Sequence, residues 1–159
     1  MEILEESEIN YNNFDEKIIY RIAHVYSMIE REIEEYLKPF NLSPAKFNIL
    51  AVIKYHGKDT GLGQTEKSEH LVVTASNIAK LLDKLNNEGL IQRYEQKGDR
   101  RKNLIKTTQK GSELIDEIWP GYCKKVKEIT GFLDKNELKQ LSIMLEKWFN
   151  SWKDYKNLT

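Results

Sequence analysis

The side chains best suited to recognition chemistry lie within residues 64–110, first of all on a predicted helix that begins after Thr74. Its apolar residues recur with steps of three and four, at Ile78, Leu81, Leu82 and Leu85. That spacing is typical of a helix with one buried face. The outward-facing residues are small, polar or basic, and they are Ala75, Ser76, Asn77, Lys80 and Lys84. Such a surface suits the major groove of DNA, where short hydrogen-bonding side chains contact base edges.

A strand, a basic turn and a second strand are predicted to follow this helix. Thr74 can cap the start of the helix, and Gly89 stands where helices commonly end. Residues 90–94 and 103–107 have strand-like patterns, and the turn at 96–102 between them is rich in lysine and arginine. Helix, strand, basic turn and strand, in this order, are the layout of a winged helix-turn-helix.

Length and composition indicate one soluble globular domain. The chain has 159 residues, of which 40% are hydrophobic and 31% are charged. No apolar run approaches the roughly 18 residues of a membrane span, and no signal peptide opens the sequence, so we expect no membrane partner. A single cysteine, Cys123, excludes an internal disulfide framework and fits the reducing cytoplasm, which is the expected location.

The net charge is zero, but the charges are unevenly distributed. Residues 1–38 carry ten Asp and Glu against four Lys and Arg, whereas residues 64–110 carry ten basic residues against six acidic ones. The basic excess therefore coincides with the predicted recognition module, where it can neutralise phosphates. Because the excess is modest, we expect binding that is specific and sensitive to salt.

Long amphipathic segments must position this module. In residues 14–38, apolar residues step by four and three as far as the break at Pro39. A heptad-like pattern of this length suits packing against another helix, including one from a second subunit, with an ordinary core face as the alternative. Ser43 and Pro44 mark the start of a helix that should run to about Tyr55. A glycine-rich connector at 56–63, a short helix at 64–71 and a tight turn at 72–73 then lead to the recognition helix.

Two further helices are predicted after the second strand. Thr107 or Thr108 caps the first of them. This helix should bend at Pro120, because proline removes a backbone donor and clashes with the preceding turn. Asp134 and Glu137 have the spacing of a capping box at the start of the last helix.

The last helix carries its own apolar stripe, at Leu138, Leu141, Leu145, Trp148, Trp152 and Tyr155. Two tryptophans near a chain terminus are costly to leave in water, so we interpret them as a dimer contact. The expected fold is mainly α with a small β-wing (α+β). It is a winged helix-turn-helix flanked by N- and C-terminal dimerisation helices, at residues 14–38 and 112–155.

Several motifs, in their order along the chain, resemble the MarR family of prokaryotic transcription regulators. They are the run at 42–50, the recognition helix, Glu88-Gly89-Leu90, Asp99-Arg100-Arg101 and the Thr108-Gln109-Lys110-Gly111 that opens the next helix. The resemblance covers about residues 14–155 and implies one MarR-like domain over residues 1–159, with residues 42–110 as the DNA-binding region. It also implies a homodimer on a palindromic operator of double-stranded DNA, released by a small phenolic or aromatic effector.

Carried over by position, the resemblance assigns DNA binding to Thr74, Ala75, Ser76, Asn77, Lys80, Lys84, Asp99, Arg100 and Arg101. It places Arg101 in the minor groove with Asp99 bracing it. A planar guanidinium suits a narrow, electronegative groove, and a carboxylate can fix its direction. A solvated turn is the alternative for residues 99–101. The candidates for phosphate contacts, each with plain surface charge as the alternative, are Lys84, Arg93, Lys97 and Lys102.

In the resembled family, an effector pocket lies between the dimer helices and the DNA-binding module. The residues that could line such a pocket in this chain are Tyr20, His24, Phe47 and Trp119. For each of them, an ordinary place in the core is the alternative interpretation. Two features depart from the family pattern, since Lys67 stands where an apolar residue is usual and the connector at 56–63 is longer than usual. Lys67 could bury its methylene stem and keep its amine in water, or the short helix could be displaced.

The sequence predicts neither catalysis nor a cofactor. His24, His56 and His70 form no ligand spacing with one another or with Cys123, so no metal site is expected. Cys123 is interpreted as a buried small hydrophobic residue rather than a redox sensor. Motifs of zinc proteases, serine hydrolases and phosphate-binding loops are absent from the sequence. The predicted function is sequence-specific DNA binding, most simply as a repressor. The alternative is a winged-helix module that binds proteins without contacting DNA.

Overall fold

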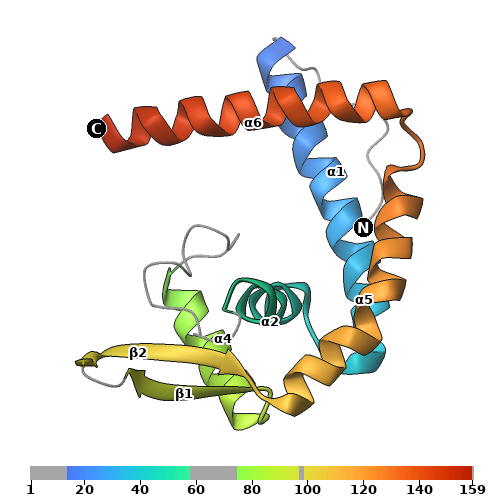
Figure 1. Ribbon diagram of the computed structural model, residues 1–159. Coiled ribbons are helices and arrows are strands. Elements are labelled where there is room, and N and C mark those ends of the chain that lie inside the picture. Colours follow the sequence, from blue (N-terminus) through green and yellow to red (C-terminus); the bar gives the residue numbers. More distant parts are fainter. Residues whose placement is uncertain (1–13, 58–74, 97–98, 159) are drawn as a thin grey trace. The chain divides into compact units, whose positions relative to one another are not determined.

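The computed structural model describes residues 14–57, 75–96 and 99–158. The chain divides between Pro120 and Gly121 into two compact units, and each unit is described by itself. In chain order the elements are α1 (Phe14–Leu37), the 3-10 helix η1 (Lys38–Phe40), α2 (Pro44–Gly57), α4 (Ala75–Asn87), β1 (Ile91–Gln96), β2 (Asp99–Thr107), α5 (Gln109–Thr130) and α6 (Lys135–Leu158) (Figure 1). The predicted mainly helical fold with a small two-stranded wing is therefore confirmed.

The start of α2 follows from its first residues. The Ser43 Oγ accepts a hydrogen bond from the N–H of Lys46 at 3.3 Å, and Pro44 occupies the first helical position, as predicted. The far end differs slightly from the prediction, because His56 and Gly57 belong to α2 rather than to the connector. Helix ends commonly fall one or two residues from a boundary inferred from sequence patterns.

The core of the first unit joins the C-terminal end of α1 to α2, α4, the wing and the first half of α5. Its most deeply buried side chains are Leu37, Ile49, Leu50, Leu85, Ile91, Ile105, Ile115 and Ile118. Apolar side chains are buried all around α2, as expected for a helix enclosed on every side. The Tyr36 hydroxyl donates a hydrogen bond to the carbonyl oxygen of Ile118 at 2.8 Å, which ties the end of α1 to α5.

The wing consists of β1 and β2, which pair antiparallel starting with Ile91 opposite Thr107. A bulge near the end of β1 precedes the last pair, Gln96 with Asp99. The prediction of a turn over residues 96–102 is therefore wrong at both ends, since β1 includes Gln96 and β2 begins at Asp99. Strand pairing that continues past the bulge outweighs the polar composition that predicted a turn.

Of the two threonines predicted to cap the next helix, Thr107 ends β2 and Thr108 caps α5. The Thr108 Oγ1 accepts a hydrogen bond from the N–H of Gly111 at 3.1 Å. α5 continues through Pro120, which is also where the first compact unit ends. The bend expected at this proline stays a prediction.

The second unit contains the end of α5 and all of α6. Its capping box is confirmed: Asp134 Oδ1 accepts hydrogen bonds from the N–H groups of Asn136 and Glu137, and Glu137 Oε2 accepts one from the N–H of Asp134. No described side chain of α6 is buried. The rings of Trp148 and Trp152 stack with centroids 6.5 Å apart, yet these residues are 38% and 53% exposed.

Some predicted features lie outside the described residues. They are the Thr74 cap, the connector from residue 58 onward, the short helix at 64–71 with Lys67, and the turn at 72–73. Within the described ranges, no helix is both long enough and apolar enough to cross a membrane.

Candidate nucleic-acid interface

The predicted recognition helix α4 exposes its polar face. Three of its assigned DNA contacts are exposed, namely Asn77, Lys80 and Lys84. The opposite stripe is buried at Ile78, Leu82 and Leu85. Ala75 and Ser76 lie in the first turn of α4, where the structure describes their backbone. α4 therefore has the amphipathic character that the sequence predicted, with hydrogen-bonding and basic side chains outward.

A Schellman motif closes the C-terminal end of α4. Gly89 has φ +71°, a left-handed conformation that favours glycine. Its N–H donates to the Asn86 carbonyl oxygen at 3.0 Å, and the N–H of Leu90 donates to the Leu85 carbonyl oxygen at 2.9 Å. Leu85 and Leu90 are both buried, which supplies the hydrophobic contact typical of this motif. Gly89 thus ends the helix as predicted, and the chain turns directly into β1.

The N-terminal end of α5 packs against this turn. The Thr108 hydroxyl donates to the Gly89 carbonyl oxygen at 2.7 Å, and the Thr108 N–H donates to the Leu90 carbonyl oxygen at 3.0 Å. Gly111 permits the close approach, because a Cβ at this position would lie 2.0 Å from the Leu90 carbonyl oxygen. The Thr-x-x-Gly pattern therefore holds the end of α4, the base of the wing and the start of α5 together.

Two basic side chains of the wing have partners within the protein. The Arg93 Nη2 lies 2.5 Å from Asp83 Oδ1 on α4, and the Lys106 ammonium lies 5.2 Å from the centre of the Tyr94 ring. Since both members of the Arg93–Asp83 pair are exposed, the pair contributes little to stability, and Arg93 can exchange Asp83 for a phosphate. A phosphate contact by Arg93 stays a prediction.

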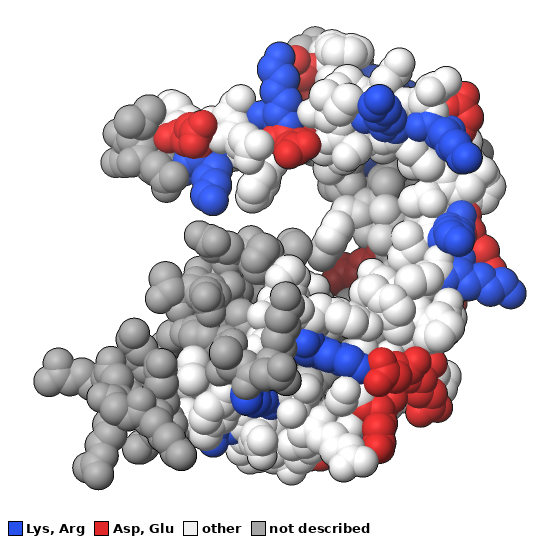
Figure 2. All heavy atoms as spheres, viewed as in Figure 1, with Lys and Arg blue, Asp and Glu red and all other residues white. Residues whose placement is uncertain are grey.

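The wing residues assigned to DNA, Asp99, Arg100 and Arg101, form the start of β2 rather than the turn. The structure does not describe the side chains of Lys97, Asp99, Arg101 and Lys102. The bracing of Arg101 by Asp99 therefore stays a prediction, and so do the phosphate contacts by Lys97 and Lys102. On the face shown in Figure 2, the described basic and acidic side chains are intermixed, in keeping with a net charge of zero.

Two of the four residues proposed for an effector pocket come together in the structure. The rings of Phe47 and Trp119 stack with centroids 6.2 Å apart, and Tyr55 lies 4.8 Å from Trp119. Tyr20 and His24 lie on the exposed N-terminal part of α1. Tyr55 was not among the pocket residues predicted from the sequence. Its position eight residues after Phe47, two steps of four along one helix, could have indicated that both rings lie on the same face.

Cys123 is partly exposed, so its predicted burial is wrong for the single chain. The physical reason is that the second unit buries none of its described side chains completely. Burial and, to a smaller extent, the neighbouring Cys123 raise the pKa of the Tyr122 phenol, and the Glu30 carboxylate raises the pKa of Tyr26. Both phenols therefore remain neutral at physiological pH. Among the described residues, no group of three His, Cys, Asp or Glu could hold a metal ion.

The comparison with known families decides the class of protein. A family model described as transcriptional regulator SarA/Rot matches residues 31–118, which is more than half of the chain. The chain belongs to this family. Its relatives and the similar solved structures agree with this assignment, so the chain is a winged-helix regulator of the MarR type.

The MarR-type relatives match over most of their own length. The HTH-type transcriptional regulator MhqR of Bacillus subtilis is 24% identical over 141 residues, which is 89% of this chain and 95% of MhqR. The repressor YetL of the same organism is 28% identical over 130 residues, covering 80% of this chain and 77% of YetL. A MarR variant from E. coli, solved in complex with operator DNA, has a TM-score of 0.74 and 25% identity, covering 85% of this chain and 97% of that one.

Membership of the MarR type indicates what the junction of α4, β1 and α5 does. The motifs that resemble the family, Glu88-Gly89-Leu90 and Thr108 to Gly111, are the residues that join α4, β1 and α5. Proteins of this family are transcriptional regulators rather than enzymes. The exposed face of α4 is therefore a candidate for DNA contact and not for catalysis.

Proposed function

We propose that the chain acts as a homodimer that binds a palindromic operator on double-stranded DNA and represses transcription. The observation that carries the proposal is the exposed polar face of α4, joined to the wing in a chain that belongs to a family of transcriptional regulators. Residues 42–110 form the DNA-binding region, and residues 14–38 and 112–155 supply the dimer contacts. The proposed location is the cytoplasm.

The proposed contacts divide between the two grooves and the backbone. The residues at the major groove are Thr74, Ala75, Ser76, Asn77 and Lys80. Lys84, one turn further along α4, contacts a phosphate, as do Arg93, Lys97 and Lys102, and Arg100 at the start of β2 also binds DNA. Arg101 enters the minor groove and Asp99 orients it.

Exposed apolar side chains support the homodimer. On α1 they are Phe14, Ile19, Tyr20, Ile22, Val25, Tyr26, Met28 and Ile29. On α6 they are Leu141, Ile143, Met144, Leu145, Trp148, Phe149, Trp152 and Tyr155. So many exposed large apolar side chains are unusual for a soluble monomer, so a second copy of the chain is the natural cover for each helix. A two-fold dimer would place two copies of α4 about one helical turn of DNA apart, so the proposed operator is a palindrome.

We further propose that a small phenolic or aromatic effector releases the DNA. The residues assigned to the effector are Tyr20, His24, Phe47 and Trp119. The stacked rings of Phe47 and Trp119 support this, because they bring two of the four together in one aromatic cluster. Repression, rather than activation, is favoured by the similarity to YetL, which is named as a repressor.

Replacing Arg101 by alanine tests the proposed function. Arg101→Ala should weaken operator binding by about 1–3 kcal/mol, the range expected for an arginine in a DNA groove, while the thermal unfolding midpoint stays the same. Fluorescence anisotropy titrations at several salt concentrations measure the change. Lys124→Ala on α5, which removes an exposed positive charge outside the proposed DNA-binding region, is the control and should change affinity far less.

The outcomes separate the proposed function from its alternative. If the unaltered protein binds DNA but Arg101→Ala binds equally well, the assignment of the wing is wrong. If the unaltered protein shows no salt-dependent DNA binding at all, the winged helix serves as a protein-interaction module instead.

A further inference from the structure

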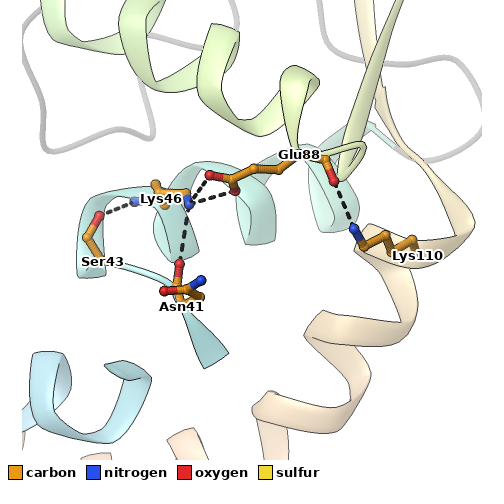
Figure 3. A network of polar contacts seen from close by, with 5 residues as sticks. All are labelled: Asn41, Ser43, Lys46, Glu88 and Lys110. Carbon is orange, nitrogen blue, oxygen red and sulfur yellow. Dashed lines mark hydrogen bonds and ion pairs between the residues drawn. The ribbon is translucent and has the colours of Figure 1, made fainter. Parts of the chain in front are cut away.

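Lys46 is a buried charge on α2 that the proposed DNA contacts do not use. Its side chain is 11% exposed. The ammonium lies 2.7 Å and 2.6 Å from the two carboxylate oxygens of Glu88, and it donates to the Asn41 carbonyl oxygen at 3.3 Å (Figure 3). Burying an ammonium is costly unless it is paired and hydrogen-bonded, and here both conditions are met. The ion pair is therefore a specific structural contact and not a chance meeting of surface charges.

Glu88 directly follows α4, which ends at Asn87, so the pair acts on the helix terminus. The Glu88 N–H donates to the Lys84 carbonyl oxygen at 2.9 Å, and Glu88 directly precedes the Schellman glycine. Its own carbonyl oxygen accepts a hydrogen bond from the Lys110 ammonium of α5 at 2.9 Å (Figure 3). A cation beside the C-terminal carbonyls also interacts favourably with the helix dipole.

Glu88 thus connects three elements at one point. Its carboxylate contacts the start of α2 through Lys46, its carbonyl contacts the start of α5 through Lys110, and its backbone closes α4. The Ser43 cap and the left-handed Asn41 fix the backbone around Lys46 in turn. A change at this junction would alter the angle of α4 relative to α2 and α5.

We infer that Lys46 is a positioning residue for DNA recognition, which acts through Glu88 to set the direction of α4. This inference rests on the proposed function, since it assigns DNA contact to the exposed face of α4. Lys46 itself is too buried to reach a phosphate, so its influence on binding must pass through the helix that it holds. Displacing a recognition element by about 1 Å is enough to lose hydrogen bonds to bases.

Lys54 provides a matched control on the same helix. Its side chain is 15% exposed, and its ammonium pairs with Asp116 Oδ1 at 2.5 Å and donates to the Ser112 carbonyl oxygen at 2.8 Å. It therefore resembles Lys46 in burial and pairing but joins α2 to α5 rather than to α4. Replacing either lysine by methionine keeps the apolar stem and removes the charge.

The experiment measures operator affinity by anisotropy for Lys46→Met, Glu88→Gln, the double variant and Lys54→Met. Lys46→Met and Glu88→Gln should each weaken binding about 10-fold, and the double variant should be no weaker than either single one, as expected for two residues that act as a pair. Lys54→Met should change affinity less than about 3-fold. Lys46→Arg, which keeps the ion pair, should recover part of the loss.

Hydrogen exchange on the DNA-free protein gives an independent readout. Lys46→Met should accelerate exchange of the Gly89 and Leu90 amides, whose hydrogen bonds close α4, whereas Lys54→Met should leave them unchanged. If Lys46→Met does not fold, the operator affinities of Glu88→Gln and Lys46→Arg are compared instead. Glu88→Gln should bind more weakly than Lys46→Arg, which keeps the ion pair.

Normal affinity of Lys46→Met and Glu88→Gln, in a protein whose unaltered form binds its operator, would overturn the inference. So would losses that multiply in the double variant, since the residues would then act independently. If the unaltered protein binds no DNA, the proposed function fails instead, and unchanged amide exchange would then refute the positioning contact on its own.

Discussion

The winged-helix unit and α6 differ in how they treat apolar side chains. In the first unit, residues from the C-terminal end of α1, from α2, α4, both strands and the first half of α5 enclose one another, and eight large side chains are almost completely buried. In α6, Phe149 remains 66% exposed, and the stacked Trp148 and Trp152 are far from covered. Both regions have well-formed helices with proper caps, so the difference lies in packing and not in local structure.

This difference teaches which part of the fold is complete in one chain. The first unit also satisfies its polar groups: no buried side-chain nitrogen or oxygen among the described residues lacks a partner. Exposed apolar area costs roughly 25 cal/mol per Å² relative to burial, so the stripe on α6 favours association strongly. The winged helix thus encloses its own core within one chain, whereas the apolar stripe of α6 stays exposed and fits the proposed dimer contact.

The largest expected effect comes from placing charges on the stripe of α6. Trp148→Glu combined with Trp152→Glu should convert the proposed dimer into monomers, because two carboxylates cannot be buried unpaired in an apolar interface. Light scattering after size-exclusion chromatography gives the mass directly. DNA affinity should fall with it, since a monomer contacts only one half-site.

A control on the same helix separates charge from position. Lys147→Glu combined with Asn150→Glu adds two carboxylates away from the tryptophan stripe and should leave the dimer intact. A dimeric mass for the tryptophan variant would show that α6 is not the interface. The exposed apolar stripe of α6 could then no longer be explained as a dimer contact.

A smaller effect is expected inside the winged-helix unit, at the junction of α4 and α5. Gly111→Ala should lower the free energy of unfolding by about 3 kcal/mol, because its Cβ would meet the Leu90 carbonyl oxygen at 2.0 Å. Gly89→Asn should cost less than about 1 kcal/mol, since nothing lies within 4 Å and asparagine tolerates a positive φ. Urea denaturation compares the two glycines, and an equal cost for both would mean that the junction is looser than the structure indicates.

Local signals in the sequence predicted most of the helix boundaries. Ser43, Gly89 and Asp134 act through hydrogen bonds that span only a few residues, so their effect can be inferred from spacing alone. The amphipathic stripe of α4 was predictable for the same reason. These features place the recognition helix and its wing in the correct order along the chain.

Contacts between distant residues could not be predicted in this way. Lys46 and Glu88 are 42 positions apart, and in the sequence Lys46 is indistinguishable from a solvated lysine near a helix start. Arg93 and Asp83 pair across two elements, and the extension of the wing to Gln96 and Asp99 depends on strand pairing. Long-range packing decides these features, and no pattern of nearby residues encodes it.

The measurement that tests the central claim most directly is selection of bound sequences from a pool of random double-stranded DNA. A homodimer with two copies of α4 should enrich a palindrome whose half-sites are centred about 10 base pairs apart, and Arg101→Ala should weaken that enrichment. Recovery of no preferred sequence, or of a single half-site without its inverted copy, would contradict a dimeric, sequence-specific regulator.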